Sequence, residues 1–253
     1  MLETSMILND LKEFEFGKFI AYNSIFLYYF IVDKFANYYK KNNSQKFLDN
    51  NTLSSVIKFY NLIIAFISCF VLVFTIFEKK VNFSLYSMSC VTIENSMIDT
   101  FYYIKYVEWM DTIFLIMKNK TVTSLHYYHH MIVPLLVYVN MGSTNNGGQY
   151  YVIVSNSLAH TLMYFYYAYP IKFKKYAKIV TSVQTVQHFG ALLIIINQYV
   201  NYTECNFQKI PFILGLICYI YFFVEFFKIL VFSKRIIKNK DNISINININ
   251  KNK

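Results

Sequence analysis

Residues 53–77 read "LSSVIKFYNLIIAFISCFVLVFTIF", a stretch in which Lys58 is the only charged side chain. An apolar helix of about 20 residues is long enough to cross a hydrocarbon core of about 30 Å. Six further segments of similar length and composition recur along the chain: 17–34, 98–117, 124–141, 149–169, 177–199 and 209–232. The sequence therefore predicts an all-α membrane protein with seven transmembrane helices.

The composition argues against a soluble globular protein. Hydrophobic residues make up 56% of the 253 residues and only 15% are charged, which leaves too few polar side chains for a soluble surface. The net charge of +10 is unevenly placed, because most of the 24 Lys and Arg fall in the 1–2, 3–4 and 5–6 connections and the C-terminal segment. Such an excess marks the cytosolic face of a membrane protein. We therefore expect a multi-pass protein with a cytosolic C-terminus and no nucleic-acid partner.

The chain divides at residue 232. Residues 1–232 hold all seven predicted spans and form one membrane domain. Residues 233–253, "SKRIIKNKDNISINININKNK", are biased toward Lys, Asn and Ile and lack a helical apolar stripe. We expect this segment to be a disordered cytosolic tail.

Two cysteines fall in connections on the same predicted face of the membrane. Cys90 lies in the 2–3 connection and Cys205 in the 6–7 connection, both on the non-cytosolic side. That compartment permits disulfides. A Cys90–Cys205 bridge is one hypothesis, and two unpaired thiols are the alternative.

Ionisable and amide side chains at membrane depth are costly and usually mark function. In "KYVEWMDT" (105–112), Lys105, Glu108 and Asp111 step by three along one predicted helix face. In "LHYYHH" (125–130), the three histidines stand at i, i+3 and i+4, which also places them on one face. These are His126, His129 and His130. For the charged stripe, an ion pair that only holds two helices together is the alternative.

Two further polar stripes follow in spans five and six. "NSLAHTLMYFYY" (156–167) aligns an amide, an imidazole and hydroxyls, namely Asn156, His160, Tyr164 and Tyr167. "TSVQTVQ" (181–187) contributes Gln184 and Gln187. Hydrogen bonding between helices explains such residues without function. However, all five histidines of the chain fall in spans four to six, which favours one shared polar cavity.

The histidines favour organic acid–base chemistry over a metal site. HxxHH also occurs in membrane di-iron desaturases and hydroxylases, but those enzymes carry several histidine boxes. Here only five histidines are present, and His160 and His188 each stand alone on a predicted helix. One helix face also aims i, i+3 and i+4 imidazoles poorly at a single ion. We expect no metal and no cofactor, with neutral imidazole as nucleophile or general base.

Together the four motifs resemble those of the ELO family of fatty-acid elongases, whose patterns read KxxExxDT, HxxHH, NxxxHxxMYxYY and TxxQxxQ. Each fixed position is matched, and the resemblance covers residues 53–232 closely and the first span loosely. It implies a very-long-chain 3-oxoacyl-CoA synthase, an acyltransferase of the endoplasmic reticulum membrane. Such an enzyme condenses acyl-CoA with malonyl-CoA to 3-ketoacyl-CoA and releases CO2 and CoA.

The resemblance also carries expectations for architecture and partners. Six of the seven helices would form a barrel around an acyl tunnel that opens to the cytosol. A disulfide between the 2–3 and 6–7 connections would fit the family. Membrane lipid would surround the enzyme, and the ketoacyl reductase, dehydratase and enoyl reductase of the elongation cycle are the candidate protein partners.

On this resemblance we assign roles to individual residues. His129 attacks the acyl thioester and forms an acyl-imidazole, while His160 orients or protonates the thioester oxygen; spacing alone does not choose His129 over its two neighbours. Surrounding hydrogen bonds would come from His126, His130, Asn156, Gln184 and Gln187, with Tyr164 and Tyr167 beside them. Ring orientation would depend on Lys105, Glu108 and Asp111.

A lysine-rich rim adjoins the predicted cytosolic entrance. It comprises Lys118, Lys120, Lys172, Lys174 and Lys175, and it suits the phosphates of CoA. Its alternative explanation is the positive charge bias of any cytosolic loop. A seven-span receptor or photosensor is the non-enzyme alternative, with Lys228 compared to a retinal-binding lysine. It does not explain four polar stripes on neighbouring spans.

Overall fold

The computed structural model describes residues 2–41, 49–78, 84–90, 97–141, 147–201, 205 and 209–251. Within these residues the regular elements are all helices. In chain order they are α1 (Leu2–Lys41), α2 (Asn50–Glu78), α3 (Leu85–Cys90), α4 (Ile98–Val107), α5 (Met110–Met117), α6 (Ser124–Met141), α7 (Gly147–Ala168), the 3-10 helix η1 (Lys174–Tyr176), α8 (Ala177–Val200) and α10 (Lys209–Lys251). The predicted all-α class is confirmed for the described part of the chain.

Three of the described helical stretches are long and apolar enough to cross a membrane. They are Asn50–Phe77, Lys174–Val200 and Lys209–Phe232. The other four predicted spans also coincide with helices, but they are more polar or shorter. The count of seven spans and the barrel around a tunnel therefore stay predictions.

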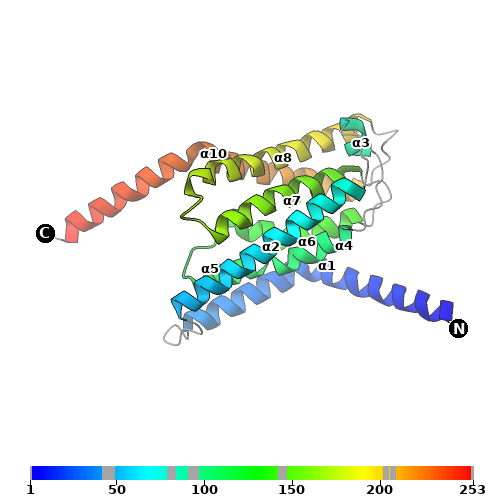
Figure 1. Cartoon of the computed structure of the whole chain (residues 1–253), viewed down its shortest axis with the longest axis horizontal. Coiled ribbons are helices and arrows are strands. Elements are labelled where there is room, and N and C mark those ends of the chain that lie inside the picture. The colour runs from blue at the N-terminus through cyan, green and yellow to red at the C-terminus, as the bar shows by residue number, and fades with distance from the viewer. Residues whose placement is uncertain are drawn as a thin grey trace.

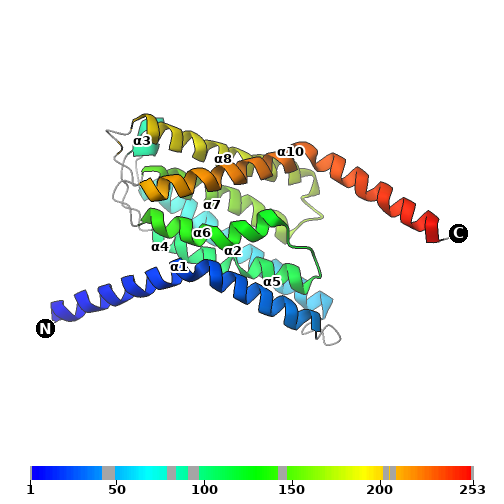
Figure 2. The same ribbon diagram turned by 180° about the vertical axis from the view of Figure 1, so that it is seen from behind.

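The helices run side by side in one bundle, with the chain ends on opposite sides (Figures 1 and 2). Helix α7 packs along α2 and α8, α8 packs along α10, and α6 contacts α10, α4 and α1. Apolar clusters join α2, α4 and α7, through Ile64, Ile104 and Tyr164 in one layer and Val71, Phe101 and Ile153 in another. Side chains of α4, α6, α7 and α8 are thereby brought to a common interior.

The third predicted span, 98–117, is two helices and not one. Helix α4 ends at Val107 and α5 begins at Met110, with Glu108 and Trp109 between them. Tight backbone bonds mark the break, since the Trp109 amide donates to the Tyr106 carbonyl at 3.2 Å and the Asp111 amide to the Glu108 carbonyl at 3.0 Å. A spacing of three fits a 3-10 turn as well as an α-helix. The charged stripe therefore bends at Glu108.

Two helices extend beyond their predicted bounds. Helix α1 begins at Leu2, although the apolar run indicated a span only from residue 17. Helix α10 continues to Lys251, through most of the segment expected to be a disordered tail, and residues 252–253 lie outside the described part. The division of the chain at residue 232 stays a prediction.

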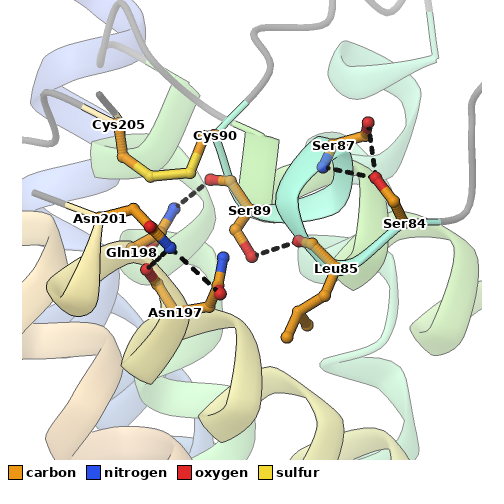
Figure 3. Close-up of a disulfide and its surroundings, with 9 residues drawn as sticks. All are labelled: Ser84, Leu85, Ser87, Ser89, Cys90, Asn197, Gln198, Asn201 and Cys205. Atoms are coloured by element: carbon orange, nitrogen blue, oxygen red, sulfur yellow. Dashed lines mark hydrogen bonds between the residues drawn. A yellow bond between two sulfur atoms is a disulfide. The ribbon is translucent and has the colours of Figure 1, made fainter.

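A disulfide joins α3 to the segment after α8. Cys90 and Cys205 are bonded, with their Cα atoms 4.5 Å apart (Figure 3). Beside the bridge, the Gln198 side-chain amide donates to the Ser89 carbonyl at 2.9 Å. This is the pair that the predicted topology places on one face of the membrane.

We expect Cys90→Ser to lower the unfolding temperature of the detergent-solubilised protein. The bridge closes a loop with a sequence separation of 115, and constraining a loop of that size contributes about 4–5 kcal/mol in the chain-entropy treatment. Cys69→Ser, at the half-buried free cysteine of α2, is the control and should leave the temperature unchanged. Equal unfolding temperatures for wild type and Cys90→Ser, with no gel shift on reduction, would contradict the bridge.

Close packing of α8 on α7 depends on Gly190. A Cβ at this position would overlap the hydroxyl and ring of Tyr151, which itself donates to the Gln187 carbonyl at 3.2 Å. We expect Gly190→Ala to destabilise the fold by about 1–3 kcal/mol, as overpacking does. Gly215→Ala is the matched helical control, because its Cβ would meet Ile195 at an ordinary 3.5 Å. Thermal unfolding measures both, and a neutral Gly190→Ala would be the contrary result.

Candidate active site

Most of the predicted site residues line one cavity of about 500 Å³. Helices α2, α5, α6, α7, α8 and α10 supply its walls, so segments far apart in the sequence meet there. The predicted residues that line it are Asp111, Lys118, Lys120, His126, His129, His130, Asn156, His160, Tyr167, Gln184 and Gln187. Four separate sequence motifs therefore contribute to one chamber.

Behind the cavity wall, Glu108 lies in a buried cluster of charge. Its Oε1 accepts from Lys105 Nζ at 2.8 Å, and the same ammonium donates to Asn156 Oδ1, also at 2.8 Å. The two charged side chains are only 2% and 1% exposed. A buried charge is tolerable only when it is paired and hydrogen-bonded. The cluster thus ties the α4–α5 junction to α7.

His160 contacts the buried Glu108 carboxylate and also lines the cavity. Its Nδ1 lies 3.0 Å from Glu108 Oε1. The ring is turned so that Nδ1, like Glu108 Oε2, has no aligned hydrogen bond to the described residues. The contact is therefore close without being a directed hydrogen bond, and it becomes an ion pair when the ring is protonated. Nε2 of His160 makes no hydrogen bond to the described side chains and is left for a ligand of the cavity.

Asp111 is held on the other side of the junction. Tyr164 of α7 donates its hydroxyl to Asp111 Oδ2, and His130 Nε2 lies 4.0 Å from the same oxygen. Tyr60 of α2 packs edge-on against Tyr164, with ring centroids 6.3 Å apart. The carboxylate is therefore shared between the α7 hydroxyl and the histidine segment of α6.

The three histidines of α6 form a contiguous surface. The rings of His126 and His130 are 4.3 Å apart by centroid, and those of His129 and His130 are 5.3 Å apart. His129 also packs against Phe222 of α10, at 5.1 Å. The Trp109 indole donates to the His130 carbonyl at 2.9 Å. The i, i+3, i+4 pattern thus gives one wall of imidazoles, steadied by the α4–α5 junction.

The predicted residues do not all reach the chamber. Lys105, Glu108 and Tyr164 stand behind its wall, where they contact residues that do line it. Gln184 donates to the Met163 sulfur at 3.2 Å. Three lysines of the predicted rim are exposed around η1 and are not part of the cavity lining: Lys172, Lys174 and Lys175.

Two cations remain at the cavity edge. Lys118 and Lys120 follow α5 and are exposed while also lining the chamber. Partial burial, and secondly the charge of Lys120, lower the pKa of Lys118 below its ordinary value. By contrast, Lys228 is exposed, pairs with Glu225 at 2.6 Å and is not part of the cavity lining, which argues against the retinal-binding comparison.

The structure places at the site four residues to which the sequence analysis assigns no role. Asn61 and His188 line the cavity and are buried, while Tyr28 and Thr112 lie behind His126. Three of them carried a usable signal. Asn61 is an amide inside an apolar span, Thr112 ends the quoted "KYVEWMDT", and His188 is one of the five histidines that fall in spans four to six. Tyr28 had none, because α1 is rich in tyrosines of similar appearance.

Comparison with known proteins decides the family. A model of the ELO (GNS1/SUR4) family matches residues 17–241. The chain belongs to the ELO family. Very long chain fatty acid elongase 7 of Rattus norvegicus is 34% identical over 116 residues, covering 43% of this chain and 41% of that protein. Putative fatty acid elongase 4 of Caenorhabditis elegans is 34% identical over 134 residues, covering 49% and 46%.

More distant eukaryotes carry relatives too. Fatty acid elongase A of Dictyostelium discoideum is 29% identical over 116 residues, which is 43% of this chain and 42% of that protein. The chain thus spans less than half the length of these curated relatives. Membership of the ELO family, together with the three apolar helices, makes the chain a multi-pass membrane protein.

We expect Glu108→Gln to destabilise this ELO protein by about 3–5 kcal/mol, because it leaves the buried Lys105 charge without its partner. Glu225→Gln is the matched control: it breaks an i, i+3 pair with Lys228 that lies at the surface of the helix bundle and not in its interior. Exposed pairs contribute about 1 kcal/mol or less. Fluorescence-detected thermal unfolding in detergent measures both variants. Similar losses for the two would show that the buried cluster has no special weight.

Proposed function

We propose that this ELO protein is a fatty-acid elongase that condenses acyl-CoA with malonyl-CoA to 3-ketoacyl-CoA, releasing CO2 and CoA. In enzyme terms it is an acyltransferase of the very-long-chain 3-oxoacyl-CoA synthase class. One observation carries the proposal: a single cavity collects imidazoles from three helices, has apolar walls, and carries two lysines at its edge. Relatives that bear the name elongase point the same way.

His129 is the nucleophile in this proposal. Its ring nitrogen attacks the acyl carbonyl carbon, the C–S bond breaks, and CoA leaves as a thiolate that takes up the ring proton. Malonyl-CoA then loses its carboxyl group as CO2, and the electron pair of the broken C–C bond becomes an enolate. The enolate carbon attacks the acyl-imidazole and the C–N bond breaks, so that the 3-ketoacyl-CoA is released. The imidazolate that leaves takes up a proton from water, which regenerates neutral His129.

The buried cluster supports the charge that develops in these steps. His160 offers Nε2 to the thioester oxygen, while the Glu108 carboxylate 3.0 Å from Nδ1 offsets positive charge on the ring. Lys105 and Asn156 hold that carboxylate and its surroundings in place. In the same way Asp111, Gln184, Gln187 and His130 bound the chamber with polar groups. Such preorganised groups stabilise a transition state without rearranging during the reaction.

The cavity edge provides for the anionic end of the substrates. Lys118 and Lys120 lie where the phosphates of CoA would enter, and Lys172, Lys174 and Lys175 extend the positive charge over the neighbouring turn. We place this edge in the cytosol, in a seven-span protein of the endoplasmic reticulum membrane whose C-terminus is cytosolic. The acyl chain would run from it into the bundle. The reductases and dehydratase of the elongation cycle would act on its product.

His129→Ala tests the proposal in liposomes with acyl-CoA and labelled malonyl-CoA. We expect label incorporation to fall by about 10²–10⁴-fold, as it does when a positioned catalytic group is removed. Tyr128→Phe, at the exposed neighbouring residue, is the control and should retain the wild-type rate.

Mass spectrometry of the wild type incubated with acyl-CoA alone should find the acyl group on the peptide containing His129. An undiminished rate in His129→Ala, or an adduct that persists in it, would overturn the role of this residue. A wild type that elongates no acyl-CoA in a panel of chain lengths would overturn the function itself.

A further inference from the structure

Helix α1 reaches the histidine wall although its residues do not line the cavity. Tyr28 is 0% exposed, and its hydroxyl lies 2.7 Å from Thr112 Oγ1. Thr112 is equally buried, and its Oγ1 lies 2.9 Å from His126 Nε2. Three side chains from α1, α5 and α6 thus form one continuous hydrogen-bonded chain that ends on a ring of the candidate active site.

We propose that Tyr28 and Thr112 are positioning residues that hold His126 as the Nδ1–H tautomer, so that His126 serves the reaction as a hydrogen-bond donor and not as the nucleophile. The proposal rests on the proposed function, because it assigns a part in that reaction. It also separates the roles of two histidines that spacing alone leaves equivalent.

The number of partners available to each hydroxyl decides which group donates in each of these two hydrogen bonds. Thr112 is the only hydrogen-bond partner of the Tyr28 hydroxyl among the described residues. A fully buried hydroxyl proton without an acceptor is costly, so Tyr28 donates to Thr112. The single Thr112 proton is then directed to His126 Nε2, which accepts it with its lone pair. In a neutral ring the proton must therefore sit on Nδ1.

The surroundings make this arrangement rigid. The Tyr28 ring packs edge-on against Trp109 at 5.3 Å and against Tyr127, also at 5.3 Å. Trp109 in turn donates to the His130 carbonyl, so the same aromatic group steadies the backbone of the α6 wall. With Nε2 occupied, His126 has no free lone pair for attack on a thioester. Its remaining function is to donate from Nδ1 to an oxygen that gains negative charge.

Substitutions of His126 itself test the donor role, because Asn places an amide N–H near the position of Nδ1 whereas Gln reaches the position of Nε2. We expect His126→Asn to keep at least tenfold more elongation activity than His126→Gln or His126→Ala. Retention of activity by His126→Gln but not by His126→Asn, or equal loss in all three, would overturn the assignment.

Substitutions of Tyr28 and Thr112 test the positioning role while the imidazole of His126 stays in place. Tyr28→Phe and Thr112→Val should each lower turnover about threefold to tenfold, the range for one neutral hydrogen bond. Thr112→Ser keeps the hydroxyl and should have the turnover of the wild type. Neither Tyr28→Phe nor Thr112→Val should reduce turnover further in a His126→Ala background, since coupled residues are non-additive. Tyr127→Phe is the matched control on the same aromatic group and should behave as wild type. Full additivity in the double variants would overturn the positioning role.

A readout independent of activity separates this proposal from the proposed function. Diethyl pyrocarbonate acylates a free imidazole lone pair, and peptide mass spectrometry gives the rate at each histidine. We expect Thr112→Val, which removes the donor to Nε2, to raise labelling of His126 at least threefold, with labelling of His129 unchanged. Unchanged labelling of His126 would overturn the inference even in an active elongase, whereas an inactive wild type with the expected labelling would overturn only the function.

Discussion

The carboxylate of Glu108 is the constraint around which the site is arranged. An unpaired charge in an apolar bundle costs several kcal/mol or more, so the carboxylate needs a cation beside it, and that cation needs an acceptor for its remaining hydrogen bonds. Lys105 comes from the same turn, and Asn156 and His160 come from α7, one helical turn apart. Satisfying one buried charge therefore fixes the register of α4 against α7. That register presents His160 to the chamber opposite the α6 wall.

The site has two layers with different physical demands. The inner layer is charged and buried, and Lys105 joins Glu108 to Asn156 within it. The outer layer, which lines the chamber, is made mainly of imidazoles and amides, with Asp111 among them and two lysines at the edge. In the proposed function, the first layer sets the electrostatic potential at the cavity wall and the orientation of His160. The second layer supplies the groups that would contact a substrate. This division explains why some motif residues line the cavity and others stand behind it.

Sequence reasoning located the helices and the residues that meet in the cavity better than it located the breaks and connections between helices. Apolar length sufficed for α2, α8 and α10, and shared polarity on adjacent spans sufficed to gather residues of four motifs into one chamber. It did not find the break between α4 and α5, because residues spaced by three lie on one stripe in either geometry. Nor did it find Tyr28, whose importance depends on packing against Trp109 and not on any local pattern. The rim lysines around η1 share only charge with Lys118, so composition could not separate the two groups.

The Cys90–Cys205 bond has a topological consequence for all of this. The two cysteines close the chain into a covalent ring, and every histidine, together with all four motifs, belongs to the ring segment between them. Helices α1, α2 and α10 are arms attached to the ring from outside. A cut in any connection within the ring opens it without separating the pieces. The candidate active site is thus carried largely by a cyclised segment, to whose cavity α2 and α10 add residues from outside the ring.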